Sequence, residues 1–283
     1  MGESHRNPPI GISENLMSNS PLKVHVTGVY GLIGNLVYGH LNKQPERYDV
    51  HGSSRRSASS IRADADSLIR LPDTHFTQAD LGDAEAMLQA IAGMDAVLHI
   101  GAVPDPGAPF EDVLHSNVVG TYNVLEACRE AGVKRLVYAS SVMATMGYFY
   151  YQEPYNAIRE ERFEDVPEDI PLITPADLPR PTEPYSASKV WGEGICRTYH
   201  DAHDIAAVCL RIGAVNKEDR SLFGWTDSLW CSQRDVANII ELALQATASP
   251  CFHICYGISD NRHRWVDLEP SRQALGFEPQ DGA

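Results

Sequence analysis

The sequence predicts an α/β fold, a doubly wound parallel sheet with helices on both faces, and three observations support this prediction. A short β-branched run over residues 22–28 leads through a glycine-rich turn into a helical pattern that extends to about Asn42. Strand-like and helical runs then alternate along the chain, as repeated βα units require. The run 96–103 is apolar throughout, which is typical of a central parallel strand covered on both faces.

The later elements follow from the same patterns. Strands are expected over 48–54, up to about Leu81, and over 96–103, 135–141, 206–213 and 252–259; helices are expected over 84–93, 109–131, 183–202, 233–246 and around Trp265 at the C-terminus. The segment 142–183 has no long periodic element and is rich in tyrosines and acidic residues. We therefore predict one domain over 21–283, with a small C-terminal substrate-binding cap formed by about 142–183 and 214–283. The aromatic residues of the first segment would form a lid or a pocket wall; the alternative, an elaborated surface loop, applies most to its acidic half.

Composition argues against several classes of protein. The 283 residues can form one large domain with a full core, and the hydrophobic (43%) and charged (22%) contents are ordinary for a globular protein. A net charge of -15 argues against nucleic acid or an anionic membrane as a partner. No apolar run approaches the roughly 20 residues needed to span a bilayer, and residues 1–20 are expected to be a flexible tail without a secretion leader.

Cysteine and histidine positions give no sign of a metal site. The 6 cysteines are scattered without the spacing of metal ligands, and we interpret them as reduced, buried thiols. The expectation is therefore a cytoplasmic protein without a bound metal. His99 lies inside an apolar strand and is expected to be a core histidine.

The first glycine-rich turn predicts a dinucleotide site. It joins a strand to a helix, which is the context that such a glycine pattern needs. Gly28 would permit the tight turn, Gly31 would let the backbone approach a pyrophosphate at the helix N-terminus, and Gly34 would let helix and strand pack closely. The alternative is a plain βα turn. We rank it second, because repeated βα units follow this turn.

The end of the second strand bears on the choice of cofactor. About 20 residues after the last glycine, an NAD site usually places an acidic side chain against the ribose 2′-hydroxyl. That position is Ser54 here, followed by Arg55 and Arg56, so no carboxylate would repel a 2′-phosphate and two guanidiniums could bind one. The pattern favours NADP; the alternative is NAD held through serine contacts, with the arginines beginning a solvated loop.

A proton-transfer pair is predicted in the run 184–189. Tyr185 and Lys189 are four residues apart and lie on one face of the expected helix. A fixed ammonium beside the phenol favours the phenolate and draws its pKa from about 10 toward the working range. Ser140 and Ser141 end a parallel strand, where ligands of such sheets bind. Asn117, inside a helix, needs partners and is either structural or orders water near the site.

Taken together, these motifs resemble the extended short-chain dehydrogenase/reductases of the NAD-dependent epimerase/dehydratase family, from the opening strand to the end of the chain. The matches are Thr27-Gly28-x-x-Gly31-x-x-Gly34, Asp80-Leu81, His99-Ile100-Gly101-Ala102, Asn117-Val118-Val119-Gly120-Thr121, Ser140-Ser141 and Tyr185-x-x-x-Lys189. Within that group the chain looks most like the uronate dehydrogenases, whose features recur in Phe110-Glu111, Arg211-Ile212-Gly213, Trp230-Cys231-Ser232 and Trp265-Val266-Asp267.

The resemblance implies a Rossmann fold and a catalytic set of Ser141, Tyr185 and Lys189. It also implies that Lys189 hydrogen-bonds the nicotinamide ribose. The cofactor contacts that it implies come from Gly28, Tyr30, Gly31, Leu32, Ile33, Gly34, Ser54, Arg55, Asp80, Leu81, Gly101, Ala102, Val103, Asn117, Lys189 and Ile212.

The substrate contacts depart from the pattern of the uronate dehydrogenases. Those enzymes usually follow the catalytic serine with Asn-His, which hold the sugar acid, whereas Val142 and Met143 stand there in this chain. An inserted residue leaves Thr145 as a second candidate for the hydroxyl role, and Arg220 is the candidate partner of a substrate carboxylate. The apolar pair favours a small substrate less polar than a sugar acid, such as a specialised metabolite or a modified sugar.

The predicted function is therefore an NAD(P)-dependent oxidoreductase that transfers a hydride between nicotinamide and a carbinol or carbonyl of a small molecule. One alternative is a sugar-nucleotide 4-epimerase or dehydratase, which normally needs a larger C-terminal cap than the 70 residues (283 minus 213) that follow Gly213. Another is a non-catalytic dinucleotide sensor, which typically lacks the tyrosine–lysine pair. The family often dimerises through two long helices, here 109–131 and 183–202, so a homodimer is expected.

Overall fold

The structure is a computed structural model that describes residues 20–63, 68–222 and 224–283. Apart from Ser20, the expected tail of residues 1–20 lies outside this described part. Among the described helices, none combines the length and the apolar character needed to cross a membrane.

A parallel sheet of 7 strands forms the centre of the molecule, in the order β3-β2-β1-β4-β5-β6-β7. The strands are β1 (Leu22–Thr27), β2 (Tyr48–Ser54), β3 (Phe76–Gln78), β4 (Ala96–His99), β5 (Arg135–Ser141), β6 (Ala206–Ile212) and β7 (Phe252–Gly257). The strand order reverses between β1 and β4, and in such sheets this leaves a crevice beyond the carboxyl ends of the strands. The order confirms the predicted doubly wound fold.

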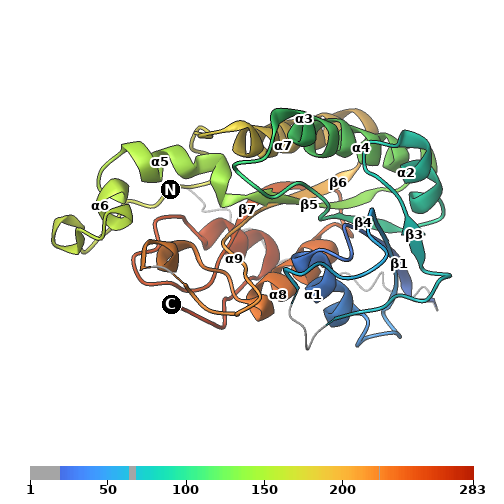
Figure 1. Ribbon diagram of the computed structural model, residues 1–283, viewed down its shortest axis with the longest axis horizontal. Coiled ribbons are helices and arrows are strands. Elements are labelled where there is room, and N and C mark those ends of the chain that lie inside the picture. The colour runs from blue at the N-terminus through green and yellow to red at the C-terminus, as the bar shows by residue number, and fades with distance from the viewer. Residues whose placement is uncertain (1–19, 64–67, 223) are drawn as a thin grey trace, which may run out of the picture.

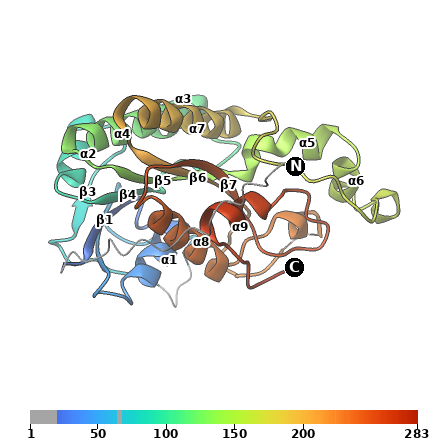
Figure 2. The same ribbon diagram turned by 180° about the vertical axis from the view of Figure 1, so that it is seen from behind.

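Helices cover both faces of the sheet (Figure 1 and Figure 2). One face carries α1 (Leu32–Leu41), α8 (Gln233–Ala246) and α9 (Glu269–Leu275), and the other carries α2 (Ala84–Ile91), α4 (Gly120–Ala131) and α7 (Pro184–His203). Alternate residues of the strands enter the two cores, because successive side chains of a strand point to opposite faces. Val24 and Val26 of β1 pack in the core beside α1 and α8, whereas Leu136 and Tyr138 of β5 pack in the core beside α4 and α7.

The start and end of α7 are set by local signals. Glu183 and Ser186 form a reciprocal capping box, and Pro184 occupies the first helical turn, where a missing N–H has no consequence. The helix ends at His203, and its C-cap residue Asp204 adopts a left-handed backbone with φ of 55°. These caps place Tyr185 and Lys189 in the first two turns of a helix that lies against β5 and β6.

The expected helix over 109–131 contains a wider turn. It consists of α3 (Phe110–Val113), a π-helical segment η2 (Leu114–Val119) and α4. The π turn holds Asn117, whose side chain bonds groups on two other elements. Periodicity alone does not report such a turn, because one extra residue barely disturbs the pattern of apolar residues.

Other boundaries also differ from the expectation. β4 ends at His99 and not at Val103, since the chain turns there and the N–H of Gly101 bonds the Thr27 hydroxyl (3.0 Å). Trp265 precedes the C-terminal helix α9 and lies fully buried next to the bridge between Ile173 and Val266.

The segment 142–183 forms short helices that pack at one end of the molecule. These are η3 (Val142–Thr145), α5 (Met146–Tyr151), α6 (Tyr155–Arg159) and η4 (Phe163–Asp165). Their apolar residues share a third core with Trp265 and Leu268, and α5 and α6 project away from the sheet (Figure 1). Much of 214–283 instead belongs to the sheet and its helix layer as α8, β7 and α9, with η5 (Gly224–Leu229) before them.

Candidate active site

A cleft of about 940 Å³ lies at the carboxyl ends of the strands. Its size falls in the upper range of small-molecule sites. The predicted cofactor residues that line it are Gly28, Tyr30, Gly31, Leu32, Ile33, Gly34, Ser54, Arg55, Gly101, Ala102, Val103, Leu81, Lys189 and Ile212. Asp80 and Asn117 are not among its lining residues.

The β1–α1 turn has the shape that a pyrophosphate requires. Gly28 adopts φ of 67°, and a Cβ at Gly34 would lie 2.3 Å from the Gly28 carbonyl oxygen. The helix α1 has no side-chain N-cap and no acidic residue in its first turn. Its first N–H groups therefore face the cleft without a helical acceptor, where the helix dipole favours an anion. The residues present fit a dinucleotide.

The end of β2 forms a cationic corner of the same cleft. Ser53, Ser54, Arg55 and Arg56 line it. The carboxylates that line the cleft, Asp105 and Glu218, come from other loops. Arg55 lies with its Nε 3.8 Å from Oδ2 of Asp80, a loose ion pair that leaves the guanidinium more than half exposed.

Asp80 and Asn117 do not line the cleft, but each contacts a residue that does. Asp80 accepts hydrogen bonds from the Gly82 N–H and from His115, both at 2.8 Å. Burial raises the pKa of this carboxyl, but these bonds outweigh the effect and hold the pKa below its usual range. His115 belongs to no recognised sequence motif, so it was not predicted from the sequence.

The side chain of Asn117 holds two elements of the site together. Its Oδ1 accepts from the Val103 N–H (2.8 Å), and its Nδ2 donates to the Val103 carbonyl (3.2 Å) and to the Ser188 hydroxyl (3.1 Å). It thereby ties the loop after β4 to α7. These partners fit the structural role considered for this residue.

Ser141, Tyr185 and Lys189 come together in the cleft. Ser141 ends β5, and a hydrogen bond joins its side chain to Tyr185. Lys189 donates to the Ala139 carbonyl (2.7 Å) and lies 5.8 Å from the centre of the Tyr185 ring. All three side chains are buried, yet all three line the cleft.

The pKa of Tyr185 differs from the expectation. Burial raises it above its ordinary value, and the hydrogen bond with Ser141 lowers it only in part. The ammonium of Lys189 donates to the Ala139 carbonyl and lies 5.1 Å from the centre of the Tyr138 ring and 5.8 Å from that of the Tyr185 ring. Burial lowers the pKa of Lys189 itself to about 8.

Of the predicted substrate residues, Met143 alone lines the cleft. Val142 packs in the third core, and Thr145 is fully buried with its hydroxyl bonded to Tyr256 and to the Val142 carbonyl. Arg220 lies in a turn closed by Asn216 and does not reach the lining. The aromatic residues of 142–183 are not among the lining residues, and Met143 is the residue of this segment that lines the cleft.

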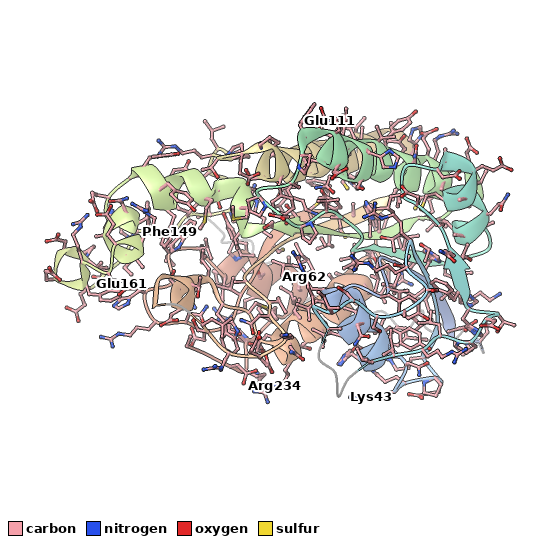
Figure 3. All side chains as sticks on the ribbon, in the orientation of Figure 1. Lys43, Arg62, Glu111, Phe149, Glu161 and Arg234 are labelled. Carbon is pink, nitrogen blue, oxygen red and sulfur yellow. The ribbon has the colours of Figure 1, made fainter. Side chains whose placement is uncertain are left out.

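Arg62 and Lys217 are cleft residues that sequence reasoning missed. Both line the cleft, from loops after β2 and β6 that also face each other across a smaller adjoining hollow. Arg62 lies near the centre of the molecule, far from Phe149 at the α5–α6 end (Figure 3). Its charge reaches Tyr185 and lowers the pKa of the phenol. Neither residue belongs to a motif, so no sequence signal marks it.

Outside the cleft, the structure places His99 and the cysteines in the interior, except for the partly buried Cys251. His99 is buried between the hydroxyls of Thr27 (2.8 Å) and Thr121 (3.0 Å), as expected of a core histidine. The cysteines are free, and all but the half-buried Cys251 are buried. The structure also brings Asp49, His51 and His75 together on β2 and beside β3, where both histidines pair with the carboxylate. That cluster was not foreseen.

Comparison with known proteins agrees with this geometry. Residues 24–216 match the NAD dependent epimerase/dehydratase family. The chain is 31% identical to an NAD-dependent glucose-6-phosphate dehydrogenase of Haloferax volcanii over 92% of its own length and 94% of that protein. It is 32% identical to a uronate dehydrogenase of Pseudomonas putida over 75% of its length and 70% of that protein.

A solved structure shares the whole architecture. A mutant of uronate dehydrogenase from Agrobacterium tumefaciens, complexed with NAD, superposes with a TM-score of 0.71 at 26% identity, covering 93% of this chain and 86% of that one. The predicted resemblance is thereby confirmed. The chain belongs to the NAD dependent epimerase/dehydratase family and is an NAD-dependent oxidoreductase of the extended short-chain dehydrogenase/reductase type.

Proposed function

We propose that the protein oxidises a hydroxyl group of a small sugar-like molecule, or reduces the corresponding carbonyl, with Ser141, Tyr185 and Lys189 as its catalytic residues. The observation that carries the proposal is the meeting of these side chains in the same cleft as an uncapped, glycine-lined helix N-terminus. The dinucleotide, when bound, supplies a nicotinamide ring that accepts or gives the hydride.

The protein residues handle the proton and the substrate oxygen. Tyr185 takes the hydroxyl proton during oxidation, or donates it during reduction. Ser141 hydrogen-bonds the same oxygen and stabilises the charge that develops on it. Lys189 fixes the end of β5 through the Ala139 carbonyl and presents a positive charge beside the phenol ring. Burial of these groups excludes water and strengthens each of these interactions.

The relatives support a sugar-like substrate. Those compared above carry the names of glucose-6-phosphate and uronate dehydrogenases, and a third relative, from Haloferax volcanii, that of an L-arabinose 1-dehydrogenase. The cleft lining contains polar groups for hydroxyl contacts, Asn216 and Lys217 among them, and also the apolar side chain of Met143.

The test is the variant Tyr185→Phe. It removes the proton-transfer group but keeps the ring, so turnover should fall to background while the dissociation constant for NAD stays within about twofold of wild type, because a phenol hydroxyl outside the cradle contributes little to cofactor binding. Activity is read as net NADH formation with a panel of sugars, which an internal epimerisation would not give. Tyr151→Phe, a change at an exposed tyrosine on α5, is the matched control. Near-normal turnover by Tyr185→Phe would contradict the proposal.

We infer further that NADP binds at least as tightly as NAD. The corner at the end of β2 supports this inference, since Arg55 and Arg56 line it and the lining carboxylates lie elsewhere. A guanidinium–phosphate hydrogen bond contributes about 1.5–3 kcal/mol. Arg55→Ala should therefore weaken NADP binding by about 10- to 150-fold and leave NAD binding almost unchanged.

Titration calorimetry with both dinucleotides measures this difference. The control is Arg129→Ala, at an exposed arginine of α4 that pairs with Glu126. If Arg55→Ala weakens the binding of NAD and NADP equally, Arg55 does not contact a 2′-phosphate.

We also propose a homodimer formed through the helices α4 and α7. The outer side of the α3–α4 helix exposes Phe110, Leu114, Val119 and Tyr122, an unusual amount of apolar surface for a helix that faces water. Light scattering on a size-exclusion column should give twice the mass of the chain, and Tyr122→Lys should shift the mass to that of one chain. A single-chain mass for the wild type would contradict this.

A further inference from the structure

Behind the catalytic residues lies a buried ion pair to which none of the steps above assigns a role. Glu193 of α7 and Arg211 of β6 are 4% and 1% exposed, and their side chains pair through both carboxylate oxygens. Nε of Arg211 donates to Oε1 (2.9 Å) and Nη2 donates to Oε2 (2.9 Å). A buried ion pair of this kind stabilises a fold no better than well-packed apolar residues do, so its position calls for a different reason.

We propose that Glu193 and Arg211 are positioning residues for the catalytic site, which hold the end of β5 and the charge of Lys189 in the geometry needed for hydride transfer. This inference rests on the proposed function and goes beyond it by naming residues that act through Ser141 and Lys189 without touching the substrate. Hydrogen bonds extend outward from the pair in two directions.

The first direction leads to the residue before the catalytic serine. The Ser140 hydroxyl donates to Oε1 of Glu193 at 2.6 Å, a short bond to a charged acceptor. Ser140 and Ser141 are adjacent on β5, so their side chains point to opposite faces of the strand. Because Glu193 anchors Ser140 on one face, Ser141 is held toward the cleft on the other.

The second direction leads to the residue after the catalytic serine. Nη1 of Arg211 donates to the Tyr256 hydroxyl (3.1 Å), which lies 3.1 Å from the Thr145 hydroxyl. Thr145 in turn donates to the Val142 carbonyl (3.1 Å). Thr145, a predicted alternative to the catalytic hydroxyl, is thus the last member of a buried chain that fixes the backbone beyond Ser141.

Lys189 lies on the same stripe of α7 as the carboxylate. Tyr185, Lys189 and Glu193 are spaced four residues apart, so they follow one another along one side of the helix. Burial lowers the pKa of Lys189 to about 8, and the negative charge of Glu193 acts against that decrease. The other titratable or charged groups around this lysine are Cys196 and Tyr185 on α7, Tyr138 on β5 and His99 on β4, with Arg211 beyond Glu193.

The decisive variant is Glu193→Gln, which keeps the shape and the bond to Ser140 but removes the charge. Lys189 should then lose its proton at a lower pH. The alkaline decrease of kcat should move toward acid by about one pH unit, the usual effect of removing one nearby opposite charge. The dissociation constant for NAD should change less than twofold, since Glu193 does not line the cleft.

The matched control is Glu241→Gln. Glu241 is also a buried carboxylate in a hydrogen-bond network, with His40, Arg47 and Tyr48, but it lies between α1 and α8. Its loss should lower the melting temperature and leave the pH profile in place. A loss of stability alone therefore cannot imitate the expected shift.

A second variant tests the inference if Glu193→Gln does not fold. Thr145→Val removes the hydroxyl that ends the chain of bonds while keeping the side-chain shape. It should lower kcat by about tenfold, the effect of one lost hydrogen bond, without moving the pH profile or the affinity for NAD. The inference is overturned if the wild-type protein turns over a sugar, Glu193→Gln does not move the pH profile of kcat, and Thr145→Val does not change kcat. The proposed function would still stand after that result. Absence of wild-type turnover with any sugar would instead count against the proposed function.

Discussion

Replacement of Gly34 by alanine should damage the dinucleotide cradle selectively. An added Cβ would lie 2.3 Å from the Gly28 carbonyl oxygen and 2.8 Å from the Val29 Cα, whereas real contacts of this kind stay beyond 3.0 Å. The neighbours are backbone atoms of the turn, so the turn itself must open by at least the difference of 0.7 Å (3.0 minus 2.3). An opened turn no longer presents its N–H groups to a pyrophosphate in the same geometry.

The expected size of the effect follows from the cost of overpacking. Forcing a methyl group into a filled space costs about 1–3 kcal/mol. The free protein can relax by opening the turn, whereas the dinucleotide complex needs the turn closed, so most of this cost should appear in binding. The dissociation constant for NAD should therefore rise by about 5- to 150-fold.

Gly39→Ala is the matched control on the same helix. A Cβ there meets only the side chain of Ile69, at 3.9 Å, and alanine is the better helix former by up to about 1 kcal/mol. Titration calorimetry should show unchanged NAD affinity for Gly39→Ala and a melting temperature at or above that of wild type. If folded Gly34→Ala binds NAD as tightly as Gly39→Ala does, the β1–α1 turn is not the pyrophosphate site.

Two further predictions concern the serine and the buried histidines. Ser141→Ala removes a hydrogen bond to the reacting oxygen, so kcat should fall by about 10²- to 10³-fold with NAD affinity retained; steady-state kinetics with kcat within threefold of wild type would contradict that role. Burial lowers the pKa of His25 and of His99 from 6.5 to about 3, so each is neutral when folded and protonated when unfolded between those values. The unfolded chain therefore binds more protons in that window, and each histidine contributes stability that is complete above pH 6.5 and is lost as the pH falls toward 3, at up to about 1.4 kcal/mol per pH unit. Urea unfolding at several pH values between 4 and 7 measures the free energy of unfolding. This free energy should rise less steeply with pH for His99→Gln than for wild type, and an equal dependence on pH would show that His99 is charged in the folded protein.

Much of the site could be predicted because its signals are local. The glycine turn needs only the run 28–34, and the proton-transfer pair needs only the spacing from Tyr185 to Lys189 on one helix. Ser141 follows from the rule that parallel strands present ligand-binding groups at their carboxyl ends. Each of these features depends on a few consecutive residues, and the structure brings all of them to one cleft.

The features that sequence reasoning missed depend on distant partners. Arg62 reaches the cleft from a long loop, and nothing in its neighbourhood in the sequence marks it. Asn117 was singled out, but its role depends on Val103 and Ser188, which only the folded chain places beside the π turn. The raised pKa of Tyr185 also depends on how deeply the phenol is buried.

Three of the four predicted substrate residues, Val142, Thr145 and Arg220, lie outside the cleft lining. They were carried over from a family pattern, from which this chain departs after Ser141 and by an inserted residue before Gly147. Val142 packs in the third core, Thr145 belongs to the buried chain of hydrogen bonds, and Arg220 lies in a surface turn closed by the Asn216 side chain. Met143 alone of that set keeps a place at the cleft.

A crystal structure with NADH and a bound sugar tests the central claim most directly, through the position of the nicotinamide ring. The pyrophosphate should lie against the first turn of α1, and the reactive face of the ring should lie toward the substrate carbon whose oxygen contacts both Tyr185 and Ser141. A nicotinamide ring placed away from Tyr185, or a pyrophosphate that does not contact the turn from Gly28 to Gly34, would contradict the account.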